Sequence, residues 1–312
     1  MNILLVTAEP LASYHLKNLE TEIKKSEHIF KHLFPYPEKS QGIPNIETTS
    51  NIEELYKADR IIIIGDIFTT WSELVAQRAV NLGKEIIISQ IPYGYSYNKR
   101  YLPRANGYTA TSKIGALFMA KYHSVDLSDI VITGHPENNK KIHYNNKSKK
   151  VLLLTTKTDR YEKYQYDITK DLIDKLTSKG YEITIRTHPR EDEILYKNLT
   201  NNKVTLSKDK SLYDEANKHK FAVGVPGSAH MTLISLGLPV ISYDPENKIN
   251  NLPSEYQKII KNKIKNIDLF DFDNLIFPSD EEIVETIGYD KDSVEKIVGY
   301  WTQKYISKND IN

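Results

Sequence analysis

Two short segments in the second half of the chain carry residue types suited to holding a phosphate group. Residues 186–190 read Arg-Thr-His-Pro-Arg, and residues 226–230 read Pro-Gly-Ser-Ala-His. The second segment lies between an apolar run at 221–225 and a helix-compatible stretch that leads to another apolar run at 239–243. A strand, a small-residue turn and a helix present backbone N–H groups and the positive end of the helix dipole to an anion. The pattern indicates a phosphate-bearing ligand and favours a nucleotide.

The basic segment supplies side-chain donors. The imidazole of His188 can donate to a phosphate oxygen, and the guanidinium groups of Arg186 and Arg190 can neutralise its charge. Pro189 fixes the turn and prevents the chain from continuing into a sheet ladder. The alternative is a histidine whose hydrogen bonds are satisfied inside a loop, flanked by solvated arginines.

The glycine-serine turn supplies backbone donors and a hydroxyl. Gly227 permits a close approach to the backbone, and Ser228 can donate to an oxygen or cap the helix. Ala229, His230 and Thr232 fall in the first turn of that helix. The alternative is that Ser228 is only an N-cap, but the pairing with the basic segment favours a ligand site.

A third segment in the same half could contact the phosphate. Residues 155–158 read Thr-Thr-Lys-Thr and follow a predicted buried strand. The hydroxyl of Thr156 is a further candidate donor, whereas Lys157 is equally well explained as a solvated side chain.

The first half offers candidates for an acceptor substrate. Asp66 follows a buried strand, where a carboxylate could accept the proton of an acceptor hydroxyl or could cap the next helix. Residues 90–108 combine five tyrosines with three basic residues, which suits stacking on a sugar. From this loop we select Tyr93, Tyr95 and Arg100 as acceptor contacts; a protein interface or a mobile loop is the alternative.

Composition excludes several classes of protein. Lys+Arg 42 against Asp+Glu 41 leaves a net charge of +1, which gives no electrostatic case for a nucleic-acid partner. The absence of cysteine excludes disulfides, thiolate catalysis and cysteine-ligated metals. No zincin, Walker or EF-hand pattern occurs, so we expect neither a metal site nor a cofactor.

The sequence also bears on location. No apolar run approaches the roughly 20 residues that cross a bilayer. The first ten residues lack the basic start of a secretory signal and instead resemble a buried strand. We expect a cytoplasmic protein, with peripheral membrane contact left open.

Alternating strands and helices predict an α/β protein of two domains. Residues 137–150 have almost no apolar content and form the predicted linker, preceded by the turn at 134–136 (Gly-His-Pro). Strands are expected at 2–7, 61–64, 86–89, 109–112 and 130–133, then at 151–155, 182–186, 204–206, 221–225 and 239–243. Helices are expected at 13–33, 71–82, 114–122, 167–179, 212–218 and 293–306, and after Ser228.

This pattern predicts two Rossmann-like domains, residues 1–136 and 151–290, whose parallel sheets face a central cleft. Residues 291–312 are expected to form a C-terminal helix that crosses back to the first domain and packs across the domain boundary. Ligands of open parallel sheets bind at the carboxyl ends of the strands, which places the phosphate-binding segments at the cleft.

The arrangement resembles the GT-B glycosyltransferases and their relatives over most of the chain. Residues 186–190 look like the His-Pro motif of bacterial sialyltransferases, Kdo transferases and CDP-glycerol glycerophosphotransferases. Gly227-Ser228 together with residues 236–241 looks like their second donor-binding segment. Residues 61–90 followed by 130–136 are also similar to the UDP-N-acetylglucosamine 2-epimerases.

The resemblance implies a nucleotide-activated sugar or polyol donor, with a cytidine nucleotide favoured, and a glycan or lipid-linked acceptor. It implies that His188 and Ser228 hold the donor phosphate with help from Arg186, that Asp66 is the acceptor base, and that no metal is needed. The helix after Ser228 lacks the glutamates of retaining enzymes and the acidic residues of the epimerases. An inverting glycosyltransferase of bacterial surface glycan synthesis is therefore expected. Glycerol phosphate transfer, a sugar epimerase and an inactive binding module stay open as alternatives.

Overall fold

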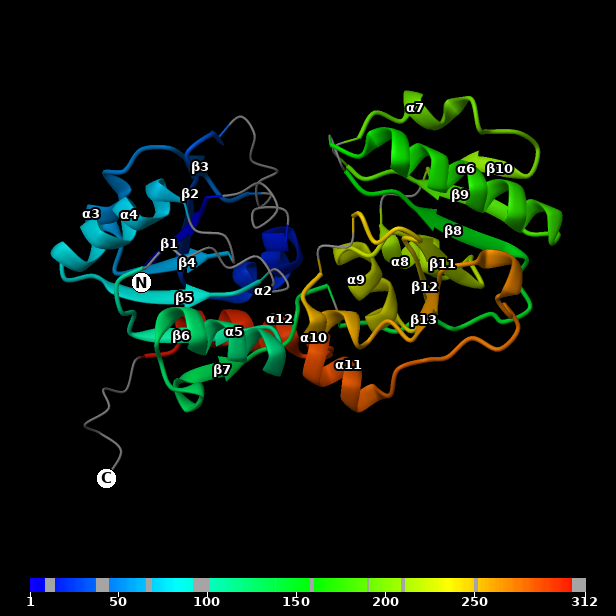
Figure 1. The fold of residues 1–312 in the computed structure, drawn as a ribbon. Coiled ribbons are helices and arrows are strands. Elements are labelled where there is room, and N and C mark those ends of the chain that lie inside the picture. Colours follow the sequence, from blue (N-terminus) through cyan, green and yellow to red (C-terminus); the bar gives the residue numbers. More distant parts are fainter. Residues whose placement is uncertain are drawn as a thin grey trace. The chain divides into compact units, whose positions relative to one another are not determined.

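The structure is a computed structural model in which the chain divides into two compact units (Figure 1). Unit 1 comprises Met1–Asn139 and the segment that starts at Val284, and unit 2 comprises Lys140–Ile283. Each unit contains one parallel sheet, of seven and six strands respectively, which confirms the predicted pair of Rossmann-like domains. The structure describes residues 1–8, 15–37, 45–65, 69–91, 102–137, 139–157, 160–189, 191–208, 211–249 and 252–304.

The sheet of unit 1 has the strand order β3-β2-β1-β4-β5-β6-β7. Its central strands contain continuous apolar runs because both faces of the sheet are covered. Leu4 and Val6 of β1 pack with residues of α4 and α5, whereas Ile3 and Leu5 pack on the other face with residues of η1 and α12. The strands are β1 (Asn2–Thr7), β2 (Ile29–Leu33), β3 (Thr48–Thr49), β4 (Arg60–Ile64), β5 (Glu85–Ser89), β6 (Gly107–Ala110) and β7 (Ile130–Ile132).

The longer helices α4 and α5 of unit 1 follow the predicted pattern, whereas α3 and η3 were not predicted. The predicted helix over 13–33 is wrong in its second half: α2 ends at Lys25, and residues 29–33 form β2, which pairs with β1. The sheet pairing overrides the helical periodicity of this stretch. The helical segments are η1 (Leu16–Leu19), α2 (Glu20–Lys25), α3 (Glu54–Lys57), α4 (Thr70–Asn81), α5 (Lys113–His123), η3 (Leu127–Asp129) and α12 (Ser293–Thr302).

The sheet of unit 2 has the order β10-β9-β8-β11-β12-β13, and Ile168 and Leu172 of α6 cover one of its faces. The strands are β8 (Lys150–Leu154), β9 (Glu182–Arg186), β10 (Val204–Leu206), β11 (Phe221–Gly224), β12 (Val240–Tyr243) and β13 (Asn262–Ile264). The helices are α6 (Glu162–Ser178), α7 (Ile194–Lys197), α8 (Leu212–Ala216), α9 (Ser228–Leu236), α10 (Ser254–Gln257), η4 (Ile267–Leu269) and α11 (Asp280–Ile287). β13, α7, α10, η4 and α11 were not predicted from the sequence.

The strand order of unit 2 sets the place of a ligand site. From β8 the chain adds β9 and β10 on one side, then returns and adds β11, β12 and β13 on the other side. The crevice between the carboxyl ends of β8 and β11 is therefore the topological switch point, where open α/β sheets bind their ligands.

The last described helix returns to unit 1, as predicted. Ile297 and Trp301 of α12 are buried against the sheet face that also contacts η1. Arg60 of β4, which is 2% exposed, donates to the carbonyl oxygens of Trp301 (2.6 Å) and Gln303 (2.8 Å). Its guanidinium also lies 2.6 Å from a carboxylate oxygen of Glu85. The buried Arg60 side chain therefore links the end of α12 to the sheet.

Part of the predicted linker packs on unit 2. The N–H of Ile142 donates to the carbonyl oxygen of Leu236 (2.8 Å), and the ring of Tyr144 lies edge-on to Phe277. The sequence-based domain boundaries stay a prediction.

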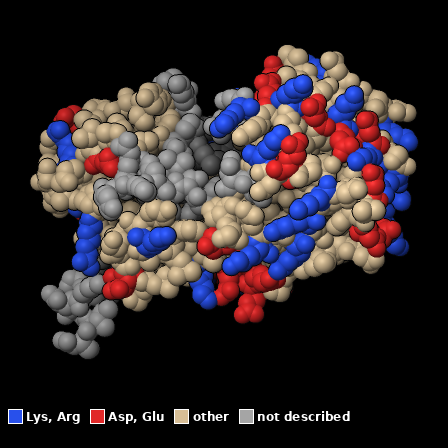
Figure 2. Space-filling view, in the orientation of Figure 1, with Lys and Arg blue, Asp and Glu red and all other residues tan. Residues whose placement is uncertain are grey.

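Lys and Arg lie among Asp and Glu over unit 2 on the face shown in Figure 2. This mixture agrees with the net charge of +1 and leaves no large field of one sign on that face.

Candidate nucleotide-binding site

Three strand ends of unit 2 bring predicted ligand residues to the switch point. Thr156 follows β8, His188 follows β9, and Gly227 follows β11. A Cβ atom placed on Gly227 would lie 3.9 Å from the hydroxyl oxygen of Thr156, so the loops after β8 and β11 are in contact. All three residues are half-buried, which leaves a polar, partly accessible edge.

A tight contact between β11 and β8 underlies this proximity. A Cβ atom on Gly224 would lie 2.3 Å from the carbonyl oxygen of Leu154, and the residue has φ +156°. Only glycine fits at the end of β11 without displacing the backbone of β8.

The N-terminus of α9 has no side-chain cap. Gly227 occupies the N-cap position and makes no side-chain cap bond, and Ser228 is the first helical residue. Ser228 is therefore not the N-cap that the alternative interpretation required. Within the described ranges its hydroxyl makes no hydrogen bond, so both the hydroxyl and the first N–H groups of the helix suit an anion.

The turn that carries His188 is fixed through its backbone. The N–H of His188 donates to the hydroxyl oxygen of Thr155 (3.1 Å) and to a carboxylate oxygen of Glu191 (3.0 Å). The N–H of Glu191 donates to the carbonyl oxygen of His188 (2.8 Å), which closes the turn around Pro189. Glu191 was not among the residues predicted from the sequence, because its contact with Thr155 joins segments 36 residues apart.

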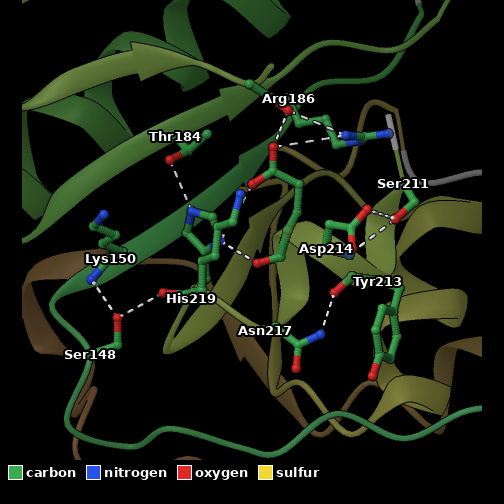
Figure 3. A network of polar contacts seen from close by, with 12 residues as sticks. Ser148, Lys150, Thr184, Arg186, Ser211, Tyr213, Asp214, Asn217 and His219 are labelled. Atoms are coloured by element: carbon green, nitrogen blue, oxygen red, sulfur yellow. Dashed lines mark hydrogen bonds and ion pairs between the residues drawn. The ribbon is translucent and has the colours of Figure 1, made fainter. Parts of the chain in front are cut away.

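Arg186 lies in a second polar network, on the side of β10 and α8 (Figure 3). Its guanidinium donates to the hydroxyl of Ser207 (3.3 Å) and lies 3.9 Å from a carboxylate oxygen of Glu215, a residue only 2% exposed. The sequence analysis assigned Arg186 to the donor phosphate, but these contacts hold its guanidinium toward Glu215.

Glu215 also orients a buried histidine. The Nδ1 atom of His219 lies 2.6 Å from the carbonyl oxygen of Glu215, and its Nε2 atom lies 2.9 Å from the hydroxyl of Thr184. Burial lowers the pKa of His219. The neutral ring then donates from Nδ1 and accepts a hydrogen bond from the hydroxyl of Thr184 at Nε2. The spacing of Glu215 and His219, four residues apart near a helix, was the available sequence signal.

His230 is buried, unlike the candidate residues Ser228 and Ala229 of the same helix. It is 1% exposed, and burial lowers its pKa to about 4, so the ring is neutral at pH 7. Its Nε2 atom has no hydrogen-bond partner in the described part of the chain. Ala229, in contrast, is half-buried beside Ser228.

The acceptor candidates of unit 1 lie outside the described residues. These are Asp66, Tyr93, Tyr95 and Arg100, and Arg190 of the basic segment also lies outside them.

The described part of unit 1 contains a buried polar cluster after β7. Nδ1 of His15 lies 3.1 Å from a carboxylate oxygen of Glu137, and the rings of His15 and His135 meet edge to face. Burial raises the pKa of Glu137, but the positive charge of His15 and its hydrogen bond to the carboxylate lower it by more. The resulting pKa of Glu137 is about 2. Burial, with the charge of His15, lowers the pKa of His135 to about 3.

The described residues provide neither a cluster suited to a metal ion nor a helix suited to a membrane. No group of three or more His, Asp or Glu side chains lies close enough there to hold a metal ion. No helix in the same residues has the length and apolar character needed to cross a membrane.

Comparison of the whole structure with known proteins reveals close likenesses of fold. No family model and no curated protein sequence matches the chain. The UDP-GlcNAc 2-epimerase of Methanocaldococcus jannaschii, solved with UDP-GlcNAc and UDP, matches with a TM-score of 0.60 over 97% of this chain and 99% of that one, at 12% identity. The chain has the GT-B fold.

Other proteins with the GT-B fold match as well. The wall teichoic acid polymerase TagF matches with a TM-score of 0.62 over 96% of this chain and 88% of that one, at 12% identity. The glycosyltransferase of kitacinnamycin matches with a TM-score of 0.56 over 96% and 93% of the two chains, at 10% identity. These proteins differ in activity, so the likeness shows the GT-B fold and does not select among their reactions.

Proposed function

We propose that the chain is an inverting, metal-independent glycosyltransferase that binds a nucleotide-activated donor on unit 2. The observation that carries the proposal is the uncapped N-terminus of α9, which lies at the switch point next to Thr156. The exposed N–H groups and the hydroxyl of Ser228 form an anion site on the strand edge where nucleotides bind in such sheets.

The donor phosphate is assigned to residues from three strand ends. His188 and Ser228 hold it by hydrogen bonds, and the hydroxyl of Thr156 and the backbone at Gly227 and Ala229 complete the cradle. Pro189 keeps the His188 turn short. Arg186 contributes its charge from the edge of the site, because Glu215 holds it there. His230 supports the packing of α9 rather than contacting the ligand, since it is buried.

The reaction follows from these assignments. The acceptor hydroxyl attacks the anomeric carbon of the donor sugar as the bond to the nucleotide phosphate breaks, which inverts the configuration. Asp66 takes the hydroxyl proton, and Tyr93, Tyr95 and Arg100 hold the acceptor. His188 and the dipole of α9 stabilise the negative charge that develops on the departing nucleotide.

The composition of α9 favours a transferase over an epimerase. Its sequence, SAHMTLISL, contains no carboxylate that could serve as the acid or base of sugar epimerisation at this end of the site. The solved neighbours include a TagF variant soaked with CDPG, which supports a cytidine nucleotide as the first donor to test. A polyol donor and a glycan or lipid-linked acceptor of the bacterial cell surface fit the same proposal.

Calorimetric titration of CMP, CDP, UDP and GDP tests the donor site. We expect micromolar binding of one nucleotide by the wild type and a loss of about tenfold to a hundredfold in His188→Ala and Ser228→Ala, because each removes a hydrogen bond to a charged group. His143→Ala is the matched control, an exposed histidine of the same unit. Absence of binding by the folded wild type would remove the proposal.

Turnover separates the candidate activities once a nucleotide is known. Transfer to an acceptor, or slow hydrolysis of the donor sugar without one, supports the transferase. Reversible isomerisation of the donor sugar would instead support an epimerase, for which the fold of the Methanocaldococcus jannaschii neighbour is the specific precedent. Binding without turnover would indicate an inactive binding module.

A further inference from the structure

Glu191 collects hydrogen bonds from both loops that form one side of the candidate site. One of its carboxylate oxygens accepts from the N–H of His188 (3.0 Å) and from the hydroxyl of Thr155. The other oxygen accepts from the hydroxyl of Tyr196 at 3.2 Å. A single carboxylate therefore receives donors that follow β8, follow β9 and lie on α7.

These bonds join two strand ends beyond the last sheet pair. Leu154 of β8 pairs with Arg186 of β9, and the N–H of Thr155 still donates to the carbonyl oxygen of Arg186 (3.2 Å). The two chains continue from there to Thr156 and His188. Glu191 bridges the two chains at this point through Thr155 and His188. It therefore sets the positions of His188 and of Thr156, the residue after Thr155.

The third donor makes the carboxylate rigid. Tyr196 is 2% exposed, and burial together with the charge of Glu191 raises its pKa, so its hydroxyl keeps the proton that it donates. A buried, packed phenol has little freedom to move, and it fixes the carboxylate against the body of unit 2.

We propose that Glu191 is a positioning residue of the donor site, which holds Thr156 and His188 in the geometry that binds the donor phosphate. The inference rests on the proposed function. Glu191 acts through hydrogen bonds and not through direct contact, because a carboxylate repels a phosphate and its oxygens already accept from three protein donors.

The amide substitution separates positioning from charge. In Glu191→Gln the carbonyl oxygen can accept from the His188 N–H and the Thr155 hydroxyl, while the new NH2 group donates to the Tyr196 oxygen. The positioning bonds then survive without the negative charge. Glu191→Ala removes the bonds and the charge together. Glu193→Ala is the matched control, since Glu193 is exposed and its side chain does not cap α7.

We expect Glu191→Ala to weaken binding of the nucleotide preferred by the wild type by about tenfold or more, and Glu191→Gln to stay within about threefold. Glu193→Ala should match the wild type. Exchange of the His188 amide proton, followed by NMR in the unliganded protein, should quicken in Glu191→Ala alone. If Glu191→Ala fails to fold, Tyr196→Phe removes only one donor and should weaken binding by about twofold to tenfold.

Two results would overturn the inference while the proposed function stands. One is unchanged binding by folded Glu191→Ala; the other is an equal loss in Glu191→Gln and Glu191→Ala, which would assign the role to charge. Failure of the proposed function looks different, because the wild type itself then binds no nucleotide, and Glu191 has no donor site to position.

Discussion

At the scale of single residues, burial keeps a set of imidazoles neutral in the folded protein. Burial is the first cause of a lowered pKa in each, and the values are about 3 to about 4; the set is His32, His123, His135 and His230. An unfolded histidine titrates near 6.5, so the unfolded chain takes up protons at a pH where the folded chain does not.

Stability should therefore fall as the pH drops below about 6.5. Because the pKa of each histidine is lower in the folded than in the unfolded protein, its contribution to the unfolding free energy is complete above the unfolded pKa. That contribution is lost as the pH falls from the unfolded pKa to the folded pKa. His32, with a pKa of about 4 and hydrogen bonds to Thr7 (2.8 Å) and Thr48, is a clear test. We expect His32→Gln to reduce the slope of unfolding free energy against pH by up to about 1.4 kcal/mol per pH unit between pH 6.5 and 5.

Urea unfolding at several pH values measures this slope. His143→Gln is the control, because His143 is exposed and should leave the slope unchanged. Glu137, with a pKa of about 2, affects only more acidic conditions, which leaves the range from 6.5 to 5 to the histidines. A slope in His32→Gln equal to that of the wild type would contradict the assignment.

Local sequence patterns indicated some residues of the candidate site and not others, for a physical reason. His188, Gly227 and Ser228 stand in local patterns, because a turn or helix start is encoded by neighbours along the chain. Glu191 and Glu215 also contact residues far away along the chain, Thr155 and Arg186 respectively, and no local pattern records those two contacts. His230 was predicted to contact the ligand, but it is buried with most of α9.

At the scale of elements, the junction of β11 and α9 contains two glycines with different duties. Gly224 permits the contact of β11 with β8, whereas a Cβ atom on Gly227 would meet only the Thr156 hydroxyl, at 3.9 Å. Gly224→Ala should cost about 3 kcal/mol of stability, because a backbone carbonyl cannot yield. Gly227→Ala should cost less than about 1 kcal/mol but weaken nucleotide binding about tenfold, by crowding the phosphate.

Thermal melts and calorimetric titration of the two variants check this pair. Equal stability of the two variants would contradict the role of Gly224, and unaltered nucleotide affinity in Gly227→Ala would contradict the placement of the phosphate.

The attachment of α12 to unit 1 depends on a buried arginine. Arg60→Ala leaves the Glu85 carboxylate and the carbonyl oxygens of Trp301 and Gln303 without their donor. We expect a loss of about 3–5 kcal/mol in the unfolding free energy, as for other broken buried pairs. Arg78→Ala, which removes an exposed arginine stacked on Tyr56, should cost less than about 1 kcal/mol.

Tryptophan fluorescence during urea unfolding reports this loss. The chain has two tryptophans, Trp71 and Trp301, and both belong to unit 1. A similar effect of Arg60→Ala and Arg78→Ala would show that the buried pair does not hold the helix.

Strong hydrophobic periodicity predicted the longer strands and helices, whereas the short edge strands form through pairing with neighbouring strands. The apolar runs that became β1, β4, β8 and β11 are buried on both faces and stand out in the sequence. The short β13 (Asn-Lys-Ile) carries no comparable signal, since its place at the sheet edge comes from pairing with β12.

At the scale of the whole molecule, the two units differ in continuity. Unit 2 is one uninterrupted segment with its own sheet and core, whereas unit 1 needs the segment from Val284 onward to cover one face of its sheet. The two Rossmann-like domains were predictable from the alternation of elements, but the compact units include residues that sequence composition assigned to the linker.

Fragments of the chain test this difference. We expect residues 140–283 alone to unfold cooperatively, because their core is complete. Residues 1–139 alone should lack a cooperative transition and bind a hydrophobic dye, since Ile3, Leu5 and Ile62 lose the cover of α12. Circular dichroism and dye fluorescence distinguish these states. A cooperative transition in residues 1–139 would contradict the need for α12.

The return of α12 to unit 1 has a consequence during translation. Residues 1–139 leave the ribosome before α12 has been made. One apolar face of their sheet therefore stays uncovered while the whole of unit 2 is synthesised. Unit 2 can complete its core once the residues after β13, among them Ile267 and Phe272, have emerged, although it is encoded second. The order of folding therefore reverses the order of synthesis. We therefore expect a ribosome-bound chaperone to bind the early part of the nascent chain, where isoleucines and leucines are uncovered.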